Sequence, residues 1–265
     1  MSQPEDKPGL PEVDFNEYGG RRDGVRQSLN RRTFFQLLVF DTPAGWSHEP
    51  LAARLRETSV SSVIYADTNG PRGFGLLTWS DDPAHFVRSV RPRFDEAPLA
   101  DALLRPGYTM LGRSYGTGHD PDLEDSLLRR PVRNVSNPDF PWHVWYPLRR
   151  KGAFSKLEPI DQSHILREHA ALGMAYGQAE AAHDVRLACH GIDADDNEFV
   201  IGLVGRELHP LSHLVQAMRK TRQTSEFIEK MGPFFVGYAI ARTLHPLFAR
   251  VSRGASHRDL GHAFQ

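Results

Sequence analysis

The chain has 265 residues, 40% of them hydrophobic and 25% charged, which is typical of a globular protein with one large domain or two fused small ones. A formal net charge of -1 gives no global reason to expect nucleic acid or an acidic membrane surface as a partner. The single cysteine, Cys189, excludes an intrachain disulfide and a cysteine-based metal cage, and it favours a reducing compartment such as the cytoplasm.

The two ends of the sequence are predicted to be extensions. Residues 1–30 and 246–265 lack hydrophobic periodicity, so we expect an N-terminal arm and a C-terminal tail of the kind that serves subunit contacts. Residues 1–24 also lack the apolar core of a signal peptide, and no apolar run approaches the roughly 20 residues of a membrane-spanning helix. We therefore expect a soluble, cytoplasmic protein.

Residues 31–115 alternate strand-like and helix-like patterns. The predicted order is a strand, a helix, two hairpin strands, a helix that begins after Pro83 and a last strand; the clearest segments are 32–40, 49–58, 59–66, 73–79 and 108–114. Asn69-Gly70 indicates the hairpin turn, because both residues tolerate positive φ. This first unit therefore reads βαββαβ.

Residues 142–245 repeat that order after a connector at 116–141. The corresponding segments are 142–148, 159–176, 184–190, 198–204, a helix opened by His209-Pro210, and 234–240. Two such halves predict an α+β fold of two fused ferredoxin-like units, whose antiparallel sheets close against each other into a barrel with helices outside.

The helix at 159–176 carries a histidine on its apolar side. His169 has the three- and four-residue spacing of Ile165, Leu172 and Tyr176, so it is predicted to face inward. On spacing alone, such a residue is more often a core histidine bonded to a backbone carbonyl than a metal ligand.

Short motifs across the second unit occur in the order found in one known family. They are Tyr146-Pro147-Leu148 before Arg149-Arg150, then Arg167-Glu168-His169 with Gly173 and Tyr176, Gly191-Ile192-Asp193, Asn197-Glu198-Phe199, Met218-Arg219 with Ser225, and residues 232–237. Together these motifs resemble the haem-binding half of the chlorite dismutase and coproheme decarboxylase superfamily. Leu148 departs from the family pattern, which has methionine there.

The resemblance implies a role for two residues in particular. His169 matches the proximal ligand of the iron in haem b or iron-coproporphyrin III, with its other ring nitrogen fixed by a carboxylate or a carbonyl. Tyr146 matches the tyrosine of coproheme decarboxylases, which relays an oxidising equivalent from peroxide-activated iron to a propionate. That propionate then loses carbon dioxide and leaves a vinyl group.

Basic side chains are the candidates for holding the porphyrin carboxylates. Arg219 and Ser225 match family positions near these carboxylates, and guanidinium and hydroxyl donors suit that role. Two further basic groups have the same potential use, although surface clusters of this kind are usually solvated: Arg149, Arg150 and Lys151 beside Tyr146, and Arg129, Arg130 and Arg133 in the connector.

The residue on the opposite, distal side of the iron is left open. The family has arginine or glutamine at this position, on the strand after the proximal helix. In this sequence, the family spacing counted forward from His169 puts Ala182 at the distal position, whereas the spacing counted back from Gly191 puts Asp184 there. His183 and Arg186 are the catalytic candidates, and they lie on opposite faces of a strand, so at most one faces the iron. Arginine would favour chlorite or peroxide chemistry, and histidine would favour a base that assists peroxide cleavage.

The resemblance therefore implies a haem-dependent oxidoreductase, foremost one that uses hydrogen peroxide to convert coproheme to haem b. Two alternatives stay open: a haem b peroxidase or chlorite-decomposing enzyme, and a haem carrier without catalysis. Homo-oligomers are expected, and rings of five are common among relatives.

Other motifs carry no prediction of a site. His209 and His213 have the spacing of a zinc pair but lack a third ligand, and the glycine pairs at 73–75 and 116–118 lack the helix that a nucleotide site requires.

Overall fold

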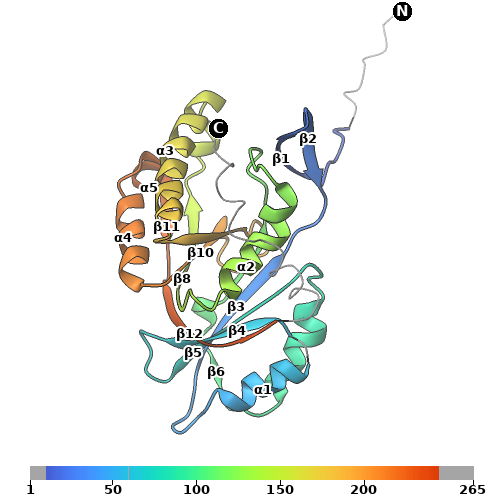
Figure 1. The fold of residues 1–265 in the computed structure, drawn as a ribbon, viewed down its shortest axis with the longest axis vertical. Coiled ribbons are helices and arrows are strands. Elements are labelled where there is room, and N and C mark those ends of the chain that lie inside the picture. The colour runs from blue at the N-terminus through green and yellow to red at the C-terminus, as the bar shows by residue number, and fades with distance from the viewer. Residues whose placement is uncertain (1–9, 59, 245–265) are drawn as a thin grey trace, which may run out of the picture.

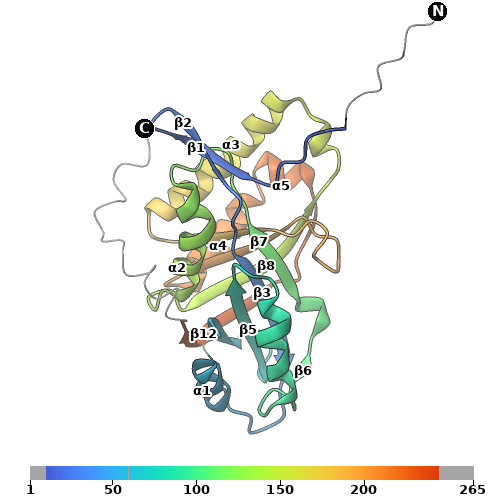
Figure 2. The same cartoon turned by 90° about the vertical axis from the view of Figure 1, so that its right-hand side faces the viewer.

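The computed structural model describes residues 10–58 and 60–244, so the predicted tail at 246–265 lies outside the described residues. The fold is mixed α+β, with one large antiparallel sheet and helices packed on its outside (Figures 1 and 2). Within the described part of the chain, no helix is both long and apolar enough to cross a membrane.

The first unit has the predicted strands around one regular helix. Its elements are β3 (Phe34–Asp41), α1 (Glu49–Glu57), β4 (Ser62–Asp67), β5 (Gly73–Ser80) and β7 (Met110–Ser114), and the strands pair in the order β7-β3-β5-β4. The second predicted helix is instead a π-helical turn at Phe86–Val90 followed by a 3-10 turn at Arg91–Asp95. Pro92 contributes to this irregularity, because proline has no amide hydrogen for the helical ladder. A short strand β6 (Leu103–Leu104) pairs with β3, and a 3-10 turn at Pro106–Tyr108 follows.

The second unit repeats this pairing order and adds two elements. Its elements are β8 (Trp142–Arg150), a 3-10 turn (Phe154–Lys156), α3 (Pro159–Gln178), β9 (His183–Ala188), β10 (Phe199–Gly205), α4 (Leu208–Met218), α5 (Arg222–Phe227), β11 (Ile228–Met231) and β12 (Phe235–Thr243). The order β12-β8-β10-β9 is that of the first unit. The added elements are α5 and β11, and β11 pairs with the end of β8.

The two units join into a closed circuit of eight strands. The last strand of each unit bridges to the other, because β7 pairs with β9 and β12 pairs with β4. The predicted pair of ferredoxin-like units is therefore confirmed, with their strand pairings closed into a ring.

A hydrophobic core fills the inside of the ring. Tyr65, Trp79 and Trp145 are among its largest side chains and are at most 1% exposed. Gly202 lies opposite Trp145 in the sheet, and a Cβ atom at residue 202 would lie 2.6 Å from the indole ring. The glycine therefore leaves the space that the tryptophan occupies.

The N-terminal segment contains a hairpin that the sequence pattern did not predict. Strands β1 (Glu17–Arg22) and β2 (Val25–Leu29) pair with each other, and Gln27 Nε2 donates to the carbonyls of Asp120 and Pro121 at 3.1 Å. The connector itself forms a π-helical turn at Asp125–Arg129 and helix α2 (Arg130–Ser136). Helix α2 lies beside β9, where Asn134 Nδ2 donates to the Asp184 carbonyl at 2.9 Å.

Candidate functional site

One row of residues across three strands defines the helix-facing side of the sheet. Tyr146 of β8 and Arg186 of β9 both lie directly opposite Ile201 of β10. Directly opposite residues in an antiparallel sheet share a face. Tyr146 packs in one cluster with Leu211 and Leu214 of α4, so this face is turned toward the helices of the second unit.

Tyr146 is enclosed on that face. Its side chain is 5% exposed, and its ring stacks on Phe234 with centroids 4.6 Å apart. Burial raises the pKa of the phenol, the carboxylate of Asp184 raises it further, and Arg219 opposes both. The phenol is therefore protonated at neutral pH, with one arginine and one aspartate close enough to act on it.

The structure separates the two distal candidates by face. Arg186 shares the face of Tyr146, and its Nε lies 3.1 Å from Asp184 Oδ2, the main cause of a raised pKa for this guanidinium. His183 lies on the other face, where its ring stacks on Phe140 with centroids 4.6 Å apart. Only Arg186 is therefore on the side of the sheet that Tyr146 occupies.

His169 projects from α3 and is partly buried. Its Nδ1 lies 3.4 Å from Thr221 Oγ1, and the Thr221 hydroxyl donates its own hydrogen to the Met218 carbonyl at 2.8 Å. The hydroxyl oxygen is therefore available to accept from Nδ1–H, which leaves the lone pair on Nε2. Burial is the main cause that lowers the pKa of His169, and the positive charge of Arg186 adds to it. The imidazole is consequently neutral at pH 7, the form that binds iron.

The acceptor beside Nδ1 differs from the expected one. The family resemblance implied a carboxylate or a carbonyl, whereas the structure places the Thr221 hydroxyl there. A neutral hydroxyl draws less electron density toward Nδ1–H than a carboxylate does, so it makes the imidazole a weaker donor to a metal.

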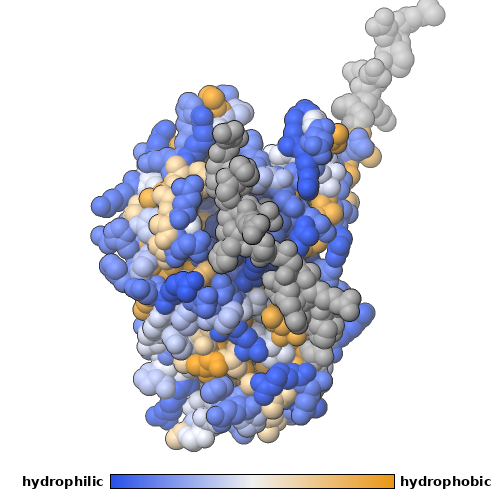
Figure 3. Space-filling model, viewed as in Figure 1, coloured by the Kyte–Doolittle hydropathy of each residue, from blue (hydrophilic) through white to orange (hydrophobic). Residues whose placement is uncertain are grey.

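Packing on either side of His169 fixes the direction of the helix face. Ile165 is buried against Phe154 and Phe227, and Tyr176 packs on the sheet cluster, so His169 between them is turned inward. Two large apolar side chains of α3 reach solvent, since Leu166 is 40% exposed and Met174 is 43% exposed (Figure 3 shows the surface by hydropathy). A neutral histidine within reach of the charge of Arg186 on the sheet is the type of residue that binds the iron of a porphyrin.

Of the predicted carboxylate-binding residues, Arg219 is the one whose charge acts on Tyr146. It is exposed at the end of α4, and its charge lowers the pKa of Tyr146. Ser225 lies on α5, where its hydroxyl donates to the backbone carbonyl of Thr221 at 3.0 Å, the same residue whose side chain faces His169.

The arginines of β8 have protein partners. Arg150 shares the face of Tyr146 by alternation, with its Nε 3.0 Å from Glu198 and its guanidinium over the rings of Phe154 and Phe199. Arg149 donates to the Asp195 carbonyl.

The arginines of the connector pair with acidic residues of the connector itself. Arg129 lies 2.9 Å from Glu124, Arg130 Nη2 lies 3.9 Å from Asp120, and Arg133 binds both oxygens of Asp125 at 3.0 and 3.2 Å. The structure thus brings together Tyr146, Arg186, Arg219 and His169, and it gives the β8 and connector arginines other partners.

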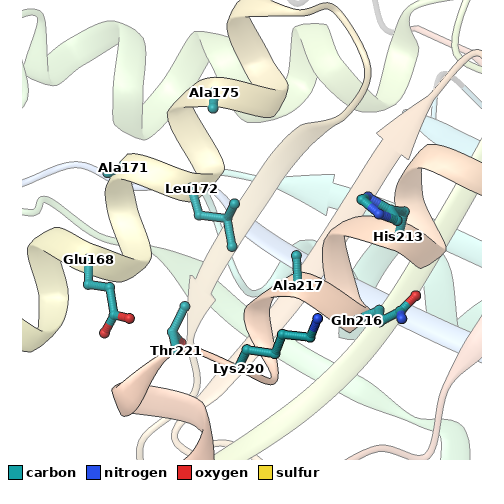
Figure 4. A pocket seen from close by; sticks show the side chains of 9 residues that line it. All are labelled: Glu168, Ala171, Leu172, Ala175, His213, Gln216, Ala217, Lys220 and Thr221. Atoms are coloured by element: carbon teal, nitrogen blue, oxygen red, sulfur yellow. The ribbon is translucent and has the colours of Figure 1, made fainter.

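A pocket of about 540 Å³ lies between α3 and α4 (Figure 4). Its lining is largely apolar, with Thr221 at one end and His213 at the other, and His213 also binds the Tyr176 hydroxyl. The full lining is Glu168, Ala171, Leu172, Ala175, His213, Gln216, Ala217, Lys220 and Thr221. In the part of the chain that the structure describes, no three His, Cys, Asp or Glu side chains gather to hold a bare metal ion.

Comparison with known proteins agrees with this geometry. Residues 129–240 match the sequence profile of the family described as chlorite dismutase. The fold is similar to a haem-binding protein from Thermus thermophilus, with 17% identity and a TM-score of 0.64 over 83% of this chain and 95% of that one. It is also similar to chlorite dismutase from Candidatus Nitrospira defluvii in complex with imidazole, with 11% identity and a TM-score of 0.61 over 83% of this chain and 95% of that one. No curated protein sequence matches.

The ring of two ferredoxin-like units, with a histidine-bearing helix over one face, has a chlorite dismutase-like α+β fold. The profile match adds the sequence pattern of the second unit, and the predicted resemblance to the chlorite dismutase and coproheme decarboxylase superfamily is thereby confirmed.

Proposed function

We propose that the protein is a haem-dependent oxidoreductase that converts iron-coproporphyrin III to haem b with hydrogen peroxide, and that His169 is its iron ligand. One observation carries the proposal. A buried, protonated phenol, Tyr146, lies on the sheet face that also presents Arg186 and that α4 covers, with Arg219 near enough to affect its pKa. These are the groups that a propionate-oxidising site requires: an oxidisable side chain and cations for carboxylates.

The overall reaction balances without a further reductant. Each propionate group, –CH2CH2COO⁻, takes up one proton and reacts with one hydrogen peroxide to give a vinyl group, carbon dioxide and two waters. The bound porphyrin iron supplies the activation of peroxide. Tyr146 passes the oxidising equivalent to the propionate, because a phenol can give up one electron and one proton and regain them.

The other side chains of the site bind and orient. His169 would hold the iron of the bound porphyrin through Nε2, while Thr221 accepts from Nδ1–H. Arg219 holds a propionate carboxylate beside Tyr146. Arg186, tethered to Asp184, donates hydrogen bonds to peroxide on the sheet side.

A second candidate function has its own support. Arg186 on the face of Tyr146 is the distal residue type that favours chlorite or peroxide decomposition by a haem b enzyme. Such an enzyme would keep its porphyrin unchanged through turnover, whereas the decarboxylase changes it.

The proposed setting is the cytoplasm, with the protein as a homo-oligomer. The single cysteine supports a reducing compartment, and burial raises the pKa of the Cys189 thiol to about 12, which keeps it protonated and unreactive at neutral pH.

Mass spectrometry of the porphyrin separates these functions. The purified protein is incubated with iron-coproporphyrin III and peroxide, and loss of two carboxyl groups is expected. An unchanged porphyrin mass with chlorite or peroxide consumed would instead support the haem b enzyme. Binding of porphyrin without any reaction would contradict both and leave a carrier.

A further inference from the structure

A tyrosine and a histidine meet inside the ring, on the opposite face of the sheet from Tyr146. Tyr65 of β4 and His143 of β8 are both 0% exposed. The Tyr65 hydroxyl lies 2.9 Å from His143 Nδ1. Neither residue belongs to the candidate site, and the proposed reaction uses neither of them.

The surroundings decide which atom of this pair donates. His143 Nε2 lies 3.0 Å from the Phe140 carbonyl oxygen, which can only accept. Nε2 therefore carries the hydrogen, and Nδ1 accepts from the Tyr65 hydroxyl. Burial lowers the pKa of His143 to about 3, and nearby Arg242, which donates to the same carbonyl at 2.8 Å, also disfavours a protonated ring. The imidazole is thus a neutral base already aligned with the phenolic proton.

Trp145 connects this pair to the candidate site. Its indole lies beside Tyr65 in the core of the ring, and Phe235, directly opposite Trp145 in the sheet, packs edge-on against Tyr65 with centroids 5.8 Å apart. Trp145 immediately precedes Tyr146, and successive residues of a strand face opposite sides. Tyr65, Trp145 and Tyr146 therefore form a path from the interior of the ring to the helix-facing side, in which the step from Trp145 to Tyr146 passes through the backbone of β8.

We infer that Tyr65 is a redox-active tyrosine that gives up an electron through Trp145 to the oxidising equivalent formed when hydrogen peroxide is reduced at the candidate site. Tyr65 is oxidised by one electron to a neutral phenoxyl radical, and its proton moves to His143 Nδ1, because an oxidised phenol is a far stronger acid than even this imidazolium. The electron fills the hole on Tyr146, whose phenol is restored by a proton from the site. This inference rests on the proposed peroxide chemistry. It means that Tyr65, inside the ring, holds an oxidising equivalent away from solvent.

A second tyrosine–histidine pair offers a matched control. The Tyr176 hydroxyl binds His213 Nδ1 at the edge of the pocket between α3 and α4, where the pair is exposed. Tyr176 therefore has the same kind of partner as Tyr65 but lies in contact with water.

The test is electron paramagnetic resonance of haem-loaded protein frozen within milliseconds of mixing with peroxide. We expect a tyrosyl signal with a histidine-bonded component, which Tyr65→Phe removes while the component from Tyr146 remains, and which Tyr176→Phe leaves unchanged. His143→Phe should shift the g-tensor to that of a phenoxyl radical without the hydrogen bond to histidine. A full signal in Tyr65→Phe, or peroxide consumption with no tyrosyl signal in the unmodified protein, would overturn the inference.

Two further measurements keep the result decisive. If Tyr65→Phe fails to fold, ¹⁵N-histidine is incorporated into the Tyr176→Phe variant, which lacks the second tyrosine–histidine pair. Coupling of the tyrosyl radical to ¹⁵N is then expected from His143. Absence of that coupling would contradict the inference. If the loaded protein does not react with peroxide, the proposed function fails. A photogenerated ruthenium(III) oxidant then tests Tyr65 alone, with a Tyr65-dependent radical as the expected result and its absence as the contrary one.

Discussion

Tyr146 and Arg186 lie in a single cross-strand row, each directly opposite Ile201, on the side of the sheet that the second-unit helices cover. Neighbouring strands are about 4.8 Å apart, so the two backbones are separated by about 10 Å. A phenol and a guanidinium that are distant in the sequence therefore face the same space, one on each side of Ile201.

Arg186 can be tested by changing it to glutamine. Loss of a preorganised donor should lower the second-order rate of peroxide consumption by about a hundredfold, while haem affinity stays within about threefold. Stopped-flow spectroscopy of the loaded protein measures both. Arg206→Gln is the control, because Arg206 is exposed and its partner is Asp139 outside the site. An unchanged rate in Arg186→Gln would show that this arginine has no part in the chemistry.

Tyr146→Phe should separate binding from conversion. The ring keeps its stacking on Phe234, so fold and porphyrin affinity are expected to be preserved. Loss of the oxidisable hydroxyl should leave both propionates intact by mass spectrometry after peroxide addition. Tyr238→Phe, on an exposed part of β12, should retain full conversion. Equal conversion by the Tyr146 variant would remove this residue from the proposed reaction.

Thr221 is predicted to set the strength of the iron ligand. Thr221→Val removes the acceptor of His169 Nδ1, and loss of such a partner typically weakens metal binding 10- to 100-fold, so we expect a fall in haem affinity of about tenfold. The iron–histidine stretching frequency of the ferrous protein should shift in the same variant. Thr224→Val is the control, since the Thr224 hydroxyl is bonded to the Thr221 hydroxyl at 3.3 Å. A frequency identical to that of the unmodified protein would contradict the role.

The repeated order of strands and helices could be predicted from the sequence, because apolar residues in each half alternate between the two-residue period of strands and the 3.6-residue period of helices. The hairpin of β1 and β2 could not, because little apolar alternation marks it. It is held instead by Gly19, packed on Asp120 and Leu123, and by the Gln27 amide on backbone carbonyls of the connector. Contacts of this kind depend on which loop lies nearby, and a single sequence does not carry that information.

The candidate site, too, could be predicted only in part from the sequence. Motif order points to His169 and Tyr146 as candidates for the site. The choice between His183 and Arg186 depends on strand register, which β9 fixes only through its pairing with β10. Thr221 was missed because it lies 52 positions from His169 and comes beside it through the packing of α3 on α5.

Acid stability should depend measurably on His143. Its pKa is about 3 in the folded protein against a usual value of 6.5, so the unfolded chain binds the extra proton between these values and stability falls as pH falls. This one group should change the free energy of unfolding by up to about 1.4 kcal/mol per pH unit in that window. Urea unfolding from pH 7 to 4 should show a shallower pH slope for His143→Phe. An equal slope would mean that other groups govern the acid response.

Gly202 provides a test of the packing inside the ring. In Gly202→Ala the new Cβ would meet the Trp145 indole at 2.6 Å, so the variant should lose about 1–3 kcal/mol of stability. Gly152→Ala is the control, since nothing lies within 4 Å of a Cβ there. Equal thermal midpoints for the two variants would contradict the packing described for Trp145.

His169 is the proposed iron ligand, and haem titration of His169→Ala tests that role directly. The unmodified protein should bind iron-porphyrin with the absorption and resonance Raman spectrum of a histidine-ligated haem. The variant should lose that iron–histidine band and bind at least about tenfold more weakly, and added imidazole should restore the spectrum. An alanine variant with unchanged spectrum and affinity would show that the iron is held elsewhere.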